Sequence, residues 1–173
     1  MNSGFLIQAL FFLLCLAFRS AYELLKESRK IDPENKLIFA TIFSSMCILW
    51  VSWFTLCLMD PFRIDLPDWL RWTGFGIFIA GTLLAVGALV QLRGVENINH
   101  LVTAGLFKKL RHPMYAGFVS WIVGWSIYHG AILSLAIGLP GIASILWWRH
   151  LEEVRLERQF GDSYLQYRLT TWF

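Results

Sequence analysis

Side chains that could carry chemistry gather in two short clusters in the second half of the chain. One cluster is Arg111-His112-Pro113-Met114-Tyr115, and the other is Arg149-His150-Leu151-Glu152-Glu153. Both adjoin long apolar runs, and charged groups beside lipid usually have a partner or a function. The imidazole, phenol, guanidinium and carboxylate groups of these clusters could bind a polar ligand and could also transfer a proton.

The first cluster stands where a helix is expected to begin. Proline is well tolerated in the first turn of a helix, because its missing N–H has no partner there. The free N–H groups of the following residues can bind a polar ligand. His112 and Tyr115 are three residues apart and therefore share one helix face. A purely structural alternative stays open, in which Arg111-His112 anchors the helix at the membrane interface and Glu152-Glu153 belongs to a solvated, ion-paired helix.

The composition predicts a membrane protein. Of the 173 residues, 57% are hydrophobic and 16% are charged, whereas soluble domains usually carry about 25% charged residues. The three cysteines lie in apolar runs without CxxC or Cys/His spacing, so we expect buried thiols and no metal site. We also expect no nucleic-acid partner.

Five membrane helices are expected from the apolar runs. A span needs about 20 apolar residues, or about 17 at the short end. The last apolar run is too long for one span, and the turn-like segment Ser126-Ile127-Tyr128-His129-Gly130 divides it. The expected helices are Gly4 to Tyr22, Leu37 to Met59, Trp69 to Leu92, Met114 to Tyr128 and Ile132 to Trp148.

Lysine and arginine are distributed unevenly over the segments between these helices. The first connection carries five, the third four and the C-terminal segment four, whereas the second carries two and the fourth none. Cytoplasmic segments are enriched in these residues. We therefore expect the N-terminus outside and the third connection and C-terminal segment in the cytosol, where the two clusters would meet. The first apolar run lacks a basic start and a small-residue cleavage site, so we expect a retained helix.

The C-terminal segment is expected to be helical as well. Gly161 should end one helix, and Asp162-Ser163 could cap a further short helix that carries Tyr164 and Tyr167. The predicted fold class is therefore all-α and integral to the membrane, with about five transmembrane helices and a cytosolic C-terminal helical segment.

The two clusters and the residues around them resemble the isoprenylcysteine carboxyl methyltransferase family and its phospholipid N-methyltransferase relatives. The shared pattern begins with Leu101-Val102-Thr103-Ala104-Gly105-Leu106-Phe107 and Arg111-His112-Pro113-Met114-Tyr115-Ala116-Gly117. It continues with Glu152-Glu153, Phe160-Gly161-Asp162-Ser163-Tyr164 and Tyr167-Arg168. The resemblance covers residues 99–173 and implies a helical membrane bundle whose C-terminal segment encloses S-adenosylmethionine, without a Rossmann sheet. The chain accordingly has no GxGxxG segment after a strand.

The resemblance also implies roles for individual residues. His112-Pro113-Met114-Tyr115 would contact the cofactor, and Glu152 would hold its amino acid end. The rest of the cofactor pocket would be lined by Asn99 or His100, Leu101, Val102 and Phe107. An arginine before the two glutamates would face the methyl acceptor. Arg149 is the candidate here, although the prenylcysteine enzymes tend to carry that arginine one residue earlier, where this chain has Trp148.

These implications predict a methyltransferase that acts on a lipid-like acceptor at the cytosolic membrane face. Carboxyl O-methylation of an isoprenylcysteine-type substrate is the first choice. Such a carboxylate needs only an orienting cation such as Arg149. Phospholipid N-methylation and small-thiol methylation stay open, and there an amine or thiol must lose a proton to Glu153, His100 or His150. A membrane reductase and a non-catalytic membrane module with a degenerate site are the alternatives from other classes.

The predicted organisation is a single methyltransferase-like domain over residues 1–173. Residues 1–92 would form a three-helix N-terminal part. Residues 93–173 would contain the cofactor-binding loop, the helical hairpin and the C-terminal segment. The brevity of the chain and its short loops favour a prokaryotic inner membrane. The sequence leaves the acceptor and the oligomeric state open.

Overall fold

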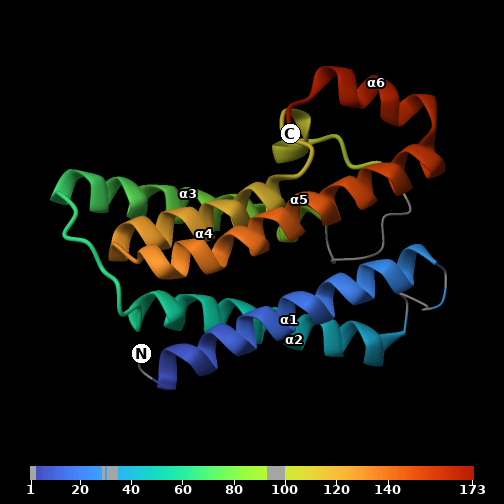
Figure 1. The fold of residues 1–173 in the computed structure, drawn as a ribbon. Coiled ribbons are helices and arrows are strands. Elements are labelled where there is room, and N and C mark those ends of the chain that lie inside the picture. Colours follow the sequence, from blue (N-terminus) through green and yellow to red (C-terminus); the bar gives the residue numbers. More distant parts are fainter. Residues whose placement is uncertain (1–2, 29, 31–34, 93–99) are drawn as a thin grey trace.

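The computed structural model of the protein describes residues 3–28, 30, 35–92 and 100–173 (Figure 1). The described residues fold into helices joined by short connections. The elements are α1 (Ser3–Glu27), α2 (Lys36–Leu58), α3 (Asp68–Leu92), the 3-10 helix η1 (Gly105–Lys108), α4 (Pro113–His129), α5 (Ile132–Phe160) and α6 (Asp162–Thr170). The all-α prediction is therefore confirmed for this part of the chain.

Four of these helices, α1, α2, α3 and α5, are long and apolar enough to cross a membrane. Helix α4 has 17 residues, which is close to the shortest length that can span the hydrocarbon core. Large apolar side chains project outward from the bundle, among them Val51 at 64% exposure and Leu83 at 69%. Such exposure is costly in water and favourable in lipid, so the outer surface fits a multi-pass membrane protein.

The helices form two layers (Figure 1). Helices α1 and α2 pack side by side, and α3, α4 and α5 form the second layer above them. Helices α3 and α4 touch along glycines, because a Cβ atom on Gly117 would lie 2.5 Å from the Gly81 carbonyl oxygen and one on Gly124 would lie 2.6 Å from the Phe78 nitrogen. The small residues of α3 thus let two backbones meet directly, as helices in lipid often do.

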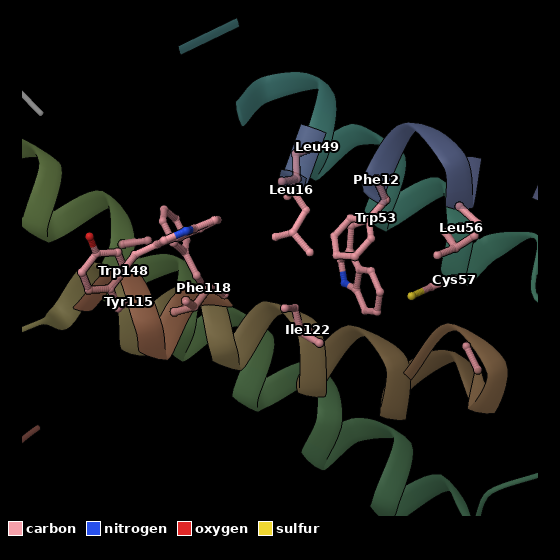
Figure 2. Packing of buried hydrophobic residues seen from close by; sticks show 14 of the residues in the cluster. Phe12, Leu16, Leu49, Trp53, Leu56, Cys57, Tyr115, Phe118, Ile122 and Trp148 are labelled. Carbon is pink, nitrogen blue, oxygen red and sulfur yellow. The ribbon is translucent and has the colours of Figure 1, made fainter. Parts of the chain in front are cut away.

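Aromatic and branched side chains fill the space between the layers (Figure 2). Phe12 of α1 and Trp53 of α2 are buried with their ring centroids 5.0 Å apart, and Ile122 of α4 belongs to the same cluster. The cluster joins α1, α2, α4 and α5 into one core.

Several predicted boundaries differ from the structure. The helix expected over Ile132 to Trp148 continues to Phe160 as the single helix α5, because neither glycine nor proline occurs between Trp148 and Gly161. Gly161 has a φ of 53° and ends the helix there, as predicted. The expected cap by Asp162 or Ser163 is wrong, since Gly161 holds the capping position of α6 without a side-chain hydrogen bond.

The turn expected over Ser126 to Gly130 is also shorter than predicted. Helix α4 continues to His129, and Gly130 ends it with a left-handed φ of 61°. A Cβ on Gly130 would collide with the Ile64 backbone. Only glycine therefore fits both the conformation and the space at this turn.

Candidate active site

Glu153 of α5 joins the two polar clusters. Its Oε1 atom lies 3.2 Å from His112 Nε2 and accepts a hydrogen bond from Arg111 Nε at 3.3 Å. Glu153 is 8% exposed and His112 is 4% exposed, so these interactions are largely shielded from water. The clusters therefore meet on one side of the bundle, as their positions along the chain predicted.

The start of α4 fixes the position of His112. His112 is the capping residue, Pro113 occupies the first helical position, and the His112 carbonyl accepts from the Ala116 N–H at 3.0 Å. One turn later Tyr115 is buried, with its ring centroid 5.7 Å from that of His112. The predicted common face of His112 and Tyr115 is confirmed.

The C-terminal residues lie along the segment that leads into α4. The Trp172 N–H donates to the Lys109 carbonyl at 2.8 Å, the Arg111 N–H donates to the Trp172 carbonyl at 3.0 Å, and the His112 N–H donates to the Phe173 carbonyl at 3.2 Å. Figure 1 shows the chain end beside η1, beneath α6. This pairing closes one side of the candidate site.

Arg111 ties this closure to α5. Arg111 contacts Glu153 through its Nε atom, and its Nη1 atom donates to the carbonyl oxygens of Thr171 at 2.6 Å and Arg168 at 3.0 Å. One guanidinium therefore connects three segments that are far apart in the chain. Sequence reasoning placed Arg111 in the motif without this linking role, and no local signal at Arg111 reveals it.

Two tyrosines of α6 face the same region. Tyr167 donates its hydroxyl hydrogen to the Phe107 carbonyl at 2.6 Å, which holds η1 against α6. Tyr164 is 0% exposed, and its hydroxyl has no hydrogen-bond partner among the described residues. Burial, with a contribution from the nearby Glu153 charge, raises the pKa of Tyr164 to about 12. At neutral pH this phenol is thus a hydrogen-bonding group and not a base.

The other predicted site residues take several positions. Glu152 is half-buried and interacts electrostatically with Tyr115. The Arg149 guanidinium lies 4.7 Å from the centroid of the Phe173 ring, and its Nε atom is buried without a hydrogen-bond partner among the described residues. Phe107 is buried, Met114, Leu101 and Val102 are half-buried, and His100 and His150 are exposed. Asn99 lies outside the described residues.

An apolar cavity of about 160 Å³ adjoins this site. Its wall includes Phe43 and Trp50 of α2, Leu89 of α3, Tyr115 and Phe118 of α4, and Trp148 of α5. Figure 2 shows Tyr115, Phe118 and Trp148 grouped at one end of the buried cluster. Tyr115 therefore belongs both to the polar site and to the wall of the cavity, which the sequence did not predict.

Arg19 of α1 also lines this cavity, and sequence reasoning missed it. A signal was present, because Arg19 and Glu23 are four residues apart near the end of an apolar run. Residues at this spacing face each other on a helix. Charged residues in such a place usually have partners inside the protein.

Comparisons with known proteins relate the chain to membrane methyltransferases. It is similar to the protein-S-isoprenylcysteine O-methyltransferase of Schizosaccharomyces pombe, with 32% identity over 111 residues that cover 56% of this chain and 45% of that protein. It is similar to the human protein of the same name, with 28% identity over 137 residues that cover 68% of this chain and 45% of that protein. The chain thus spans about half the length of these relatives. No solved structure gives a significant match.

The phospholipid methyltransferase family model matches residues 69–163. The match begins with α3 and ends in the first turn of α6, so it includes both polar clusters and the glycine contacts between α3 and α4. It covers 95 of the 173 residues, which is more than half of the chain. The chain therefore belongs to the phospholipid methyltransferase family.

Proposed function

We propose that the protein is an S-adenosylmethionine-dependent methyltransferase that methylates the carboxylate of an isoprenylcysteine-type acceptor at the cytosolic membrane face. Family membership and the names of its relatives support this activity. The observation that carries it is the position of Tyr115, which contacts the polar cluster through His112 and also lines the apolar cavity. A polar cofactor and an apolar acceptor could meet at such a boundary.

The proposed topology has five membrane spans, with α4 as the short one. Its glycine contacts with the spanning helix α3 support a membrane position for α4. The N-terminus would then lie outside, and the basic segments around Arg111 and Arg155 would lie in the cytosol, in agreement with the positive-inside rule.

The residues present fit the proposed cofactor. Buried polar atoms normally have hydrogen-bond partners, yet the Tyr164 hydroxyl and Arg149 Nε have none among the described residues. A cofactor that carries amino, carboxylate and hydroxyl groups offers such partners. Glu152 would hold its ammonium group, and the rest of its pocket would come from His112-Pro113-Met114-Tyr115 and the loop residues Asn99, His100, Leu101, Val102 and Phe107. When bound, the cofactor supplies a methyl group on an electrophilic sulfonium.

The chain's own residues would position the acceptor and exclude water. A carboxylate acceptor needs no base, so Glu153 is free to act as a positioning residue that holds His112 and Arg111. Arg149 would help to orient the acceptor carboxylate, since a guanidinium can hold a carboxylate through two parallel hydrogen bonds. Direct methyl transfer depends mainly on such alignment.

The apolar part of the acceptor would enter from the bilayer. Phe43 lines the cavity and is also 53% exposed on the outer surface of α2. The cavity wall is therefore continuous with the lipid-facing surface, which allows sideways entry of a prenyl chain.

The first test is calorimetric titration of S-adenosylmethionine into the detergent-purified protein, with Glu152→Ala beside it. We expect binding by the wild type and a loss of affinity of about tenfold or more in the variant, the usual scale for a lost hydrogen bond to a charged group. Glu157→Ala is the matched control, because Glu157 lies on the same helix with its side chain 48% exposed. Absence of binding by folded wild-type protein would contradict the proposal.

An activity assay then distinguishes the acceptors. We expect methyl transfer to N-acetyl-S-farnesylcysteine and little transfer to phosphatidylethanolamine or a small aromatic thiol. Preferential methylation of the amine or the thiol would replace the carboxylate proposal with that chemistry.

A further inference from the structure

The apolar cavity ends on a group of aromatic rings. Its wall runs along α2 and α4, and both helices begin toward the end of the bundle that carries α6 (Figure 1). Among the described residues of the wall, Trp50 lies furthest along α2 and Trp121 lies furthest along α4. These two rings meet edge to face with their centroids 4.8 Å apart, and Trp50 also packs on Phe118 at 4.9 Å. The three rings therefore form the deep end of the cavity, away from Tyr115.

Further aromatic rings fill the space beyond this deep end. Phe54 follows Trp50 by one turn on α2, and its ring centroid lies 5.7 Å from those of both Trp121 and Trp125. The Trp121 indole N–H donates to Thr82 Oγ1 at 2.9 Å, and the Trp125 indole N–H donates to the Phe54 carbonyl at 3.2 Å. Packing and hydrogen bonds thus hold this second layer, so the cavity cannot extend past it unless a side chain is replaced.

Trp50 differs from the other two indoles of this group. It is half-buried, and its Nε1 atom is buried without a hydrogen-bond partner among the described residues. Ring packing alone therefore holds the Trp50 side chain. Its replacement would lengthen the cavity without breaking a hydrogen bond, whereas replacement of Trp121 would leave Thr82 without its indole partner.

The length of the cavity selects among prenyl chains. Its wall on α2 extends from Phe39 to Trp50, which is about 16 Å at about 1.5 Å per residue. An extended covalent chain advances about 1.2 Å per bond, so a farnesyl group with about 12 bonds in its main chain spans about 14 Å and a geranylgeranyl group about 19 Å. The farnesyl chain fits between the start of this wall and Trp50, and the geranylgeranyl chain does not.

We propose that Trp50 is a specificity-determining residue that limits the methyl acceptor to a prenyl chain of farnesyl length or shorter. The inference rests on the proposed function and adds to it a residue from α2, outside the region that matches the family. A longer chain would have to displace the Trp50 ring from its contacts with Phe118 and Trp121.

The test compares three acceptors that differ only in chain length, the N-acetylcysteines that carry S-geranyl, S-farnesyl and S-geranylgeranyl groups. Affinity and kcat/KM would be measured for each in the same detergent. Pockets that fit an apolar chain usually discriminate by about tenfold or more against a group that is too large. We expect the wild type to favour farnesyl over geranylgeranyl on this scale, and we expect Trp50→Leu to remove most of that preference.

A second variant changes the cavity in the opposite direction. Met46 lies one turn before Trp50 on α2 and belongs to the cavity wall. Met46→Phe should shorten the space above Trp50 and shift the preference from farnesyl toward geranyl. This variant tests the proposal even if Trp50→Leu fails to fold.

Trp53→Leu is the matched control. Trp53 lies three residues after Trp50 on the same helix, and its Nε1 atom is likewise buried without a hydrogen-bond partner among the described residues. It is 0% exposed and is not among the residues of the cavity wall. We expect Trp53→Leu to lower the unfolding midpoint and to keep the wild-type chain preference. An equal shift of preference in Trp53→Leu and Trp50→Leu would overturn the proposal, because it would mean that any loosening of the bundle admits the longer chain.

Other outcomes separate this inference from the proposed activity. Equal affinities of the wild type for farnesyl and geranylgeranyl acceptors would overturn the inference and would mean that the chain leaves the cavity beside Phe43 into the lipid. Methyl transfer with an unchanged preference in folded Trp50→Leu would refute the role of Trp50 and keep the methyltransferase. A Trp50-dependent preference in binding without any methyl transfer would refute the methyltransferase and keep the role of Trp50.

Discussion

At the scale of single residues, the two neighbouring glutamates have different surroundings. Glu153 accepts from Arg111 and contacts His112, whereas Glu152 interacts with Tyr115. Consecutive residues of an α-helix point about 100° apart, so both cannot face the same partner. The sequence identified the pair, but which glutamate meets His112 depends on the rotation of α5 against α4.

Replacing Glu153 by glutamine should destabilise the protein. Glutamine keeps the size of the side chain but removes the negative charge that Arg111 and His112 contact, and hydrogen bonds to charged groups contribute about 1.5–3 kcal/mol. We expect a clearly lower midpoint of thermal unfolding in detergent for Glu153→Gln. Glu157→Gln is the control, because the wild-type Glu157 carboxylate lies 3.8 Å from Arg168 with both side chains about half exposed. Equal unfolding midpoints for wild type and Glu153→Gln would show that this contact contributes nothing to stability.

At the scale of elements, the close packing of α3 and α4 holds the start of α4 in place. Gly74 and Gly81 of α3 face Gly124 and Gly117 of α4, and added Cβ atoms would meet the opposite backbone. Small residues in α3 predicted a helix contact but did not identify α4 as the partner. Helix α4 is the partner because its glycines match those of α3: on each helix the two glycines are seven residues apart.

Gly124→Ala should separate these two helices. The added methyl would lie 2.6 Å from the Phe78 nitrogen, and overpacking of this kind usually costs about 1–3 kcal/mol. We expect a lower unfolding midpoint and weaker cofactor binding, since α4 carries His112 and Tyr115 at its start. Gly76→Ala is the matched control on α3, because nothing lies within 4 Å of its added Cβ. If both variants unfold alike, backbone contact between α3 and α4 is not a source of stability.

At the scale of the whole molecule, the apolar helices and the basic segments give the bundle two distinct ends. His112, Glu153 and the C-terminal residues lie together at one end. The connection between α2 and α3 lies at the other end, where Ile64 contacts the turn between α4 and α5. A chain arranged in this way should expose these ends on opposite sides of the membrane.

Impermeant thiol labelling in intact cells tests this topology. In a variant whose three cysteines are replaced by alanine, we would introduce Asp65→Cys or Ser163→Cys, both at exposed positions. With five spans and the N-terminus outside, Asp65→Cys should react in intact cells and Ser163→Cys only after permeabilisation. The opposite pattern would show that the protein has the inverse orientation in the membrane. Reaction of both introduced cysteines in intact cells would contradict the five spans.

The sequence by itself determined the helices, the polar clusters and the family. In lipid the backbone must satisfy its own hydrogen bonds, so a long apolar run is sufficient to predict a helix. Helix ends were less certain, and α5 continued beyond its apolar run because Arg149 to Gln159 contain no residue that stops a helix.

Only the tertiary structure decided which side chains meet. Arg19 and Trp148 are 129 residues apart, and His112 and Glu153 are 41 apart. Several charged residues of α5 could have paired with each partner by type alone. The crossing and rotation of the packed helices select among them, and these depend on how the whole bundle fills its core and not on any local pattern. For that reason the cavity, its cation Arg19 and the linking role of Arg111 became visible only in the folded bundle.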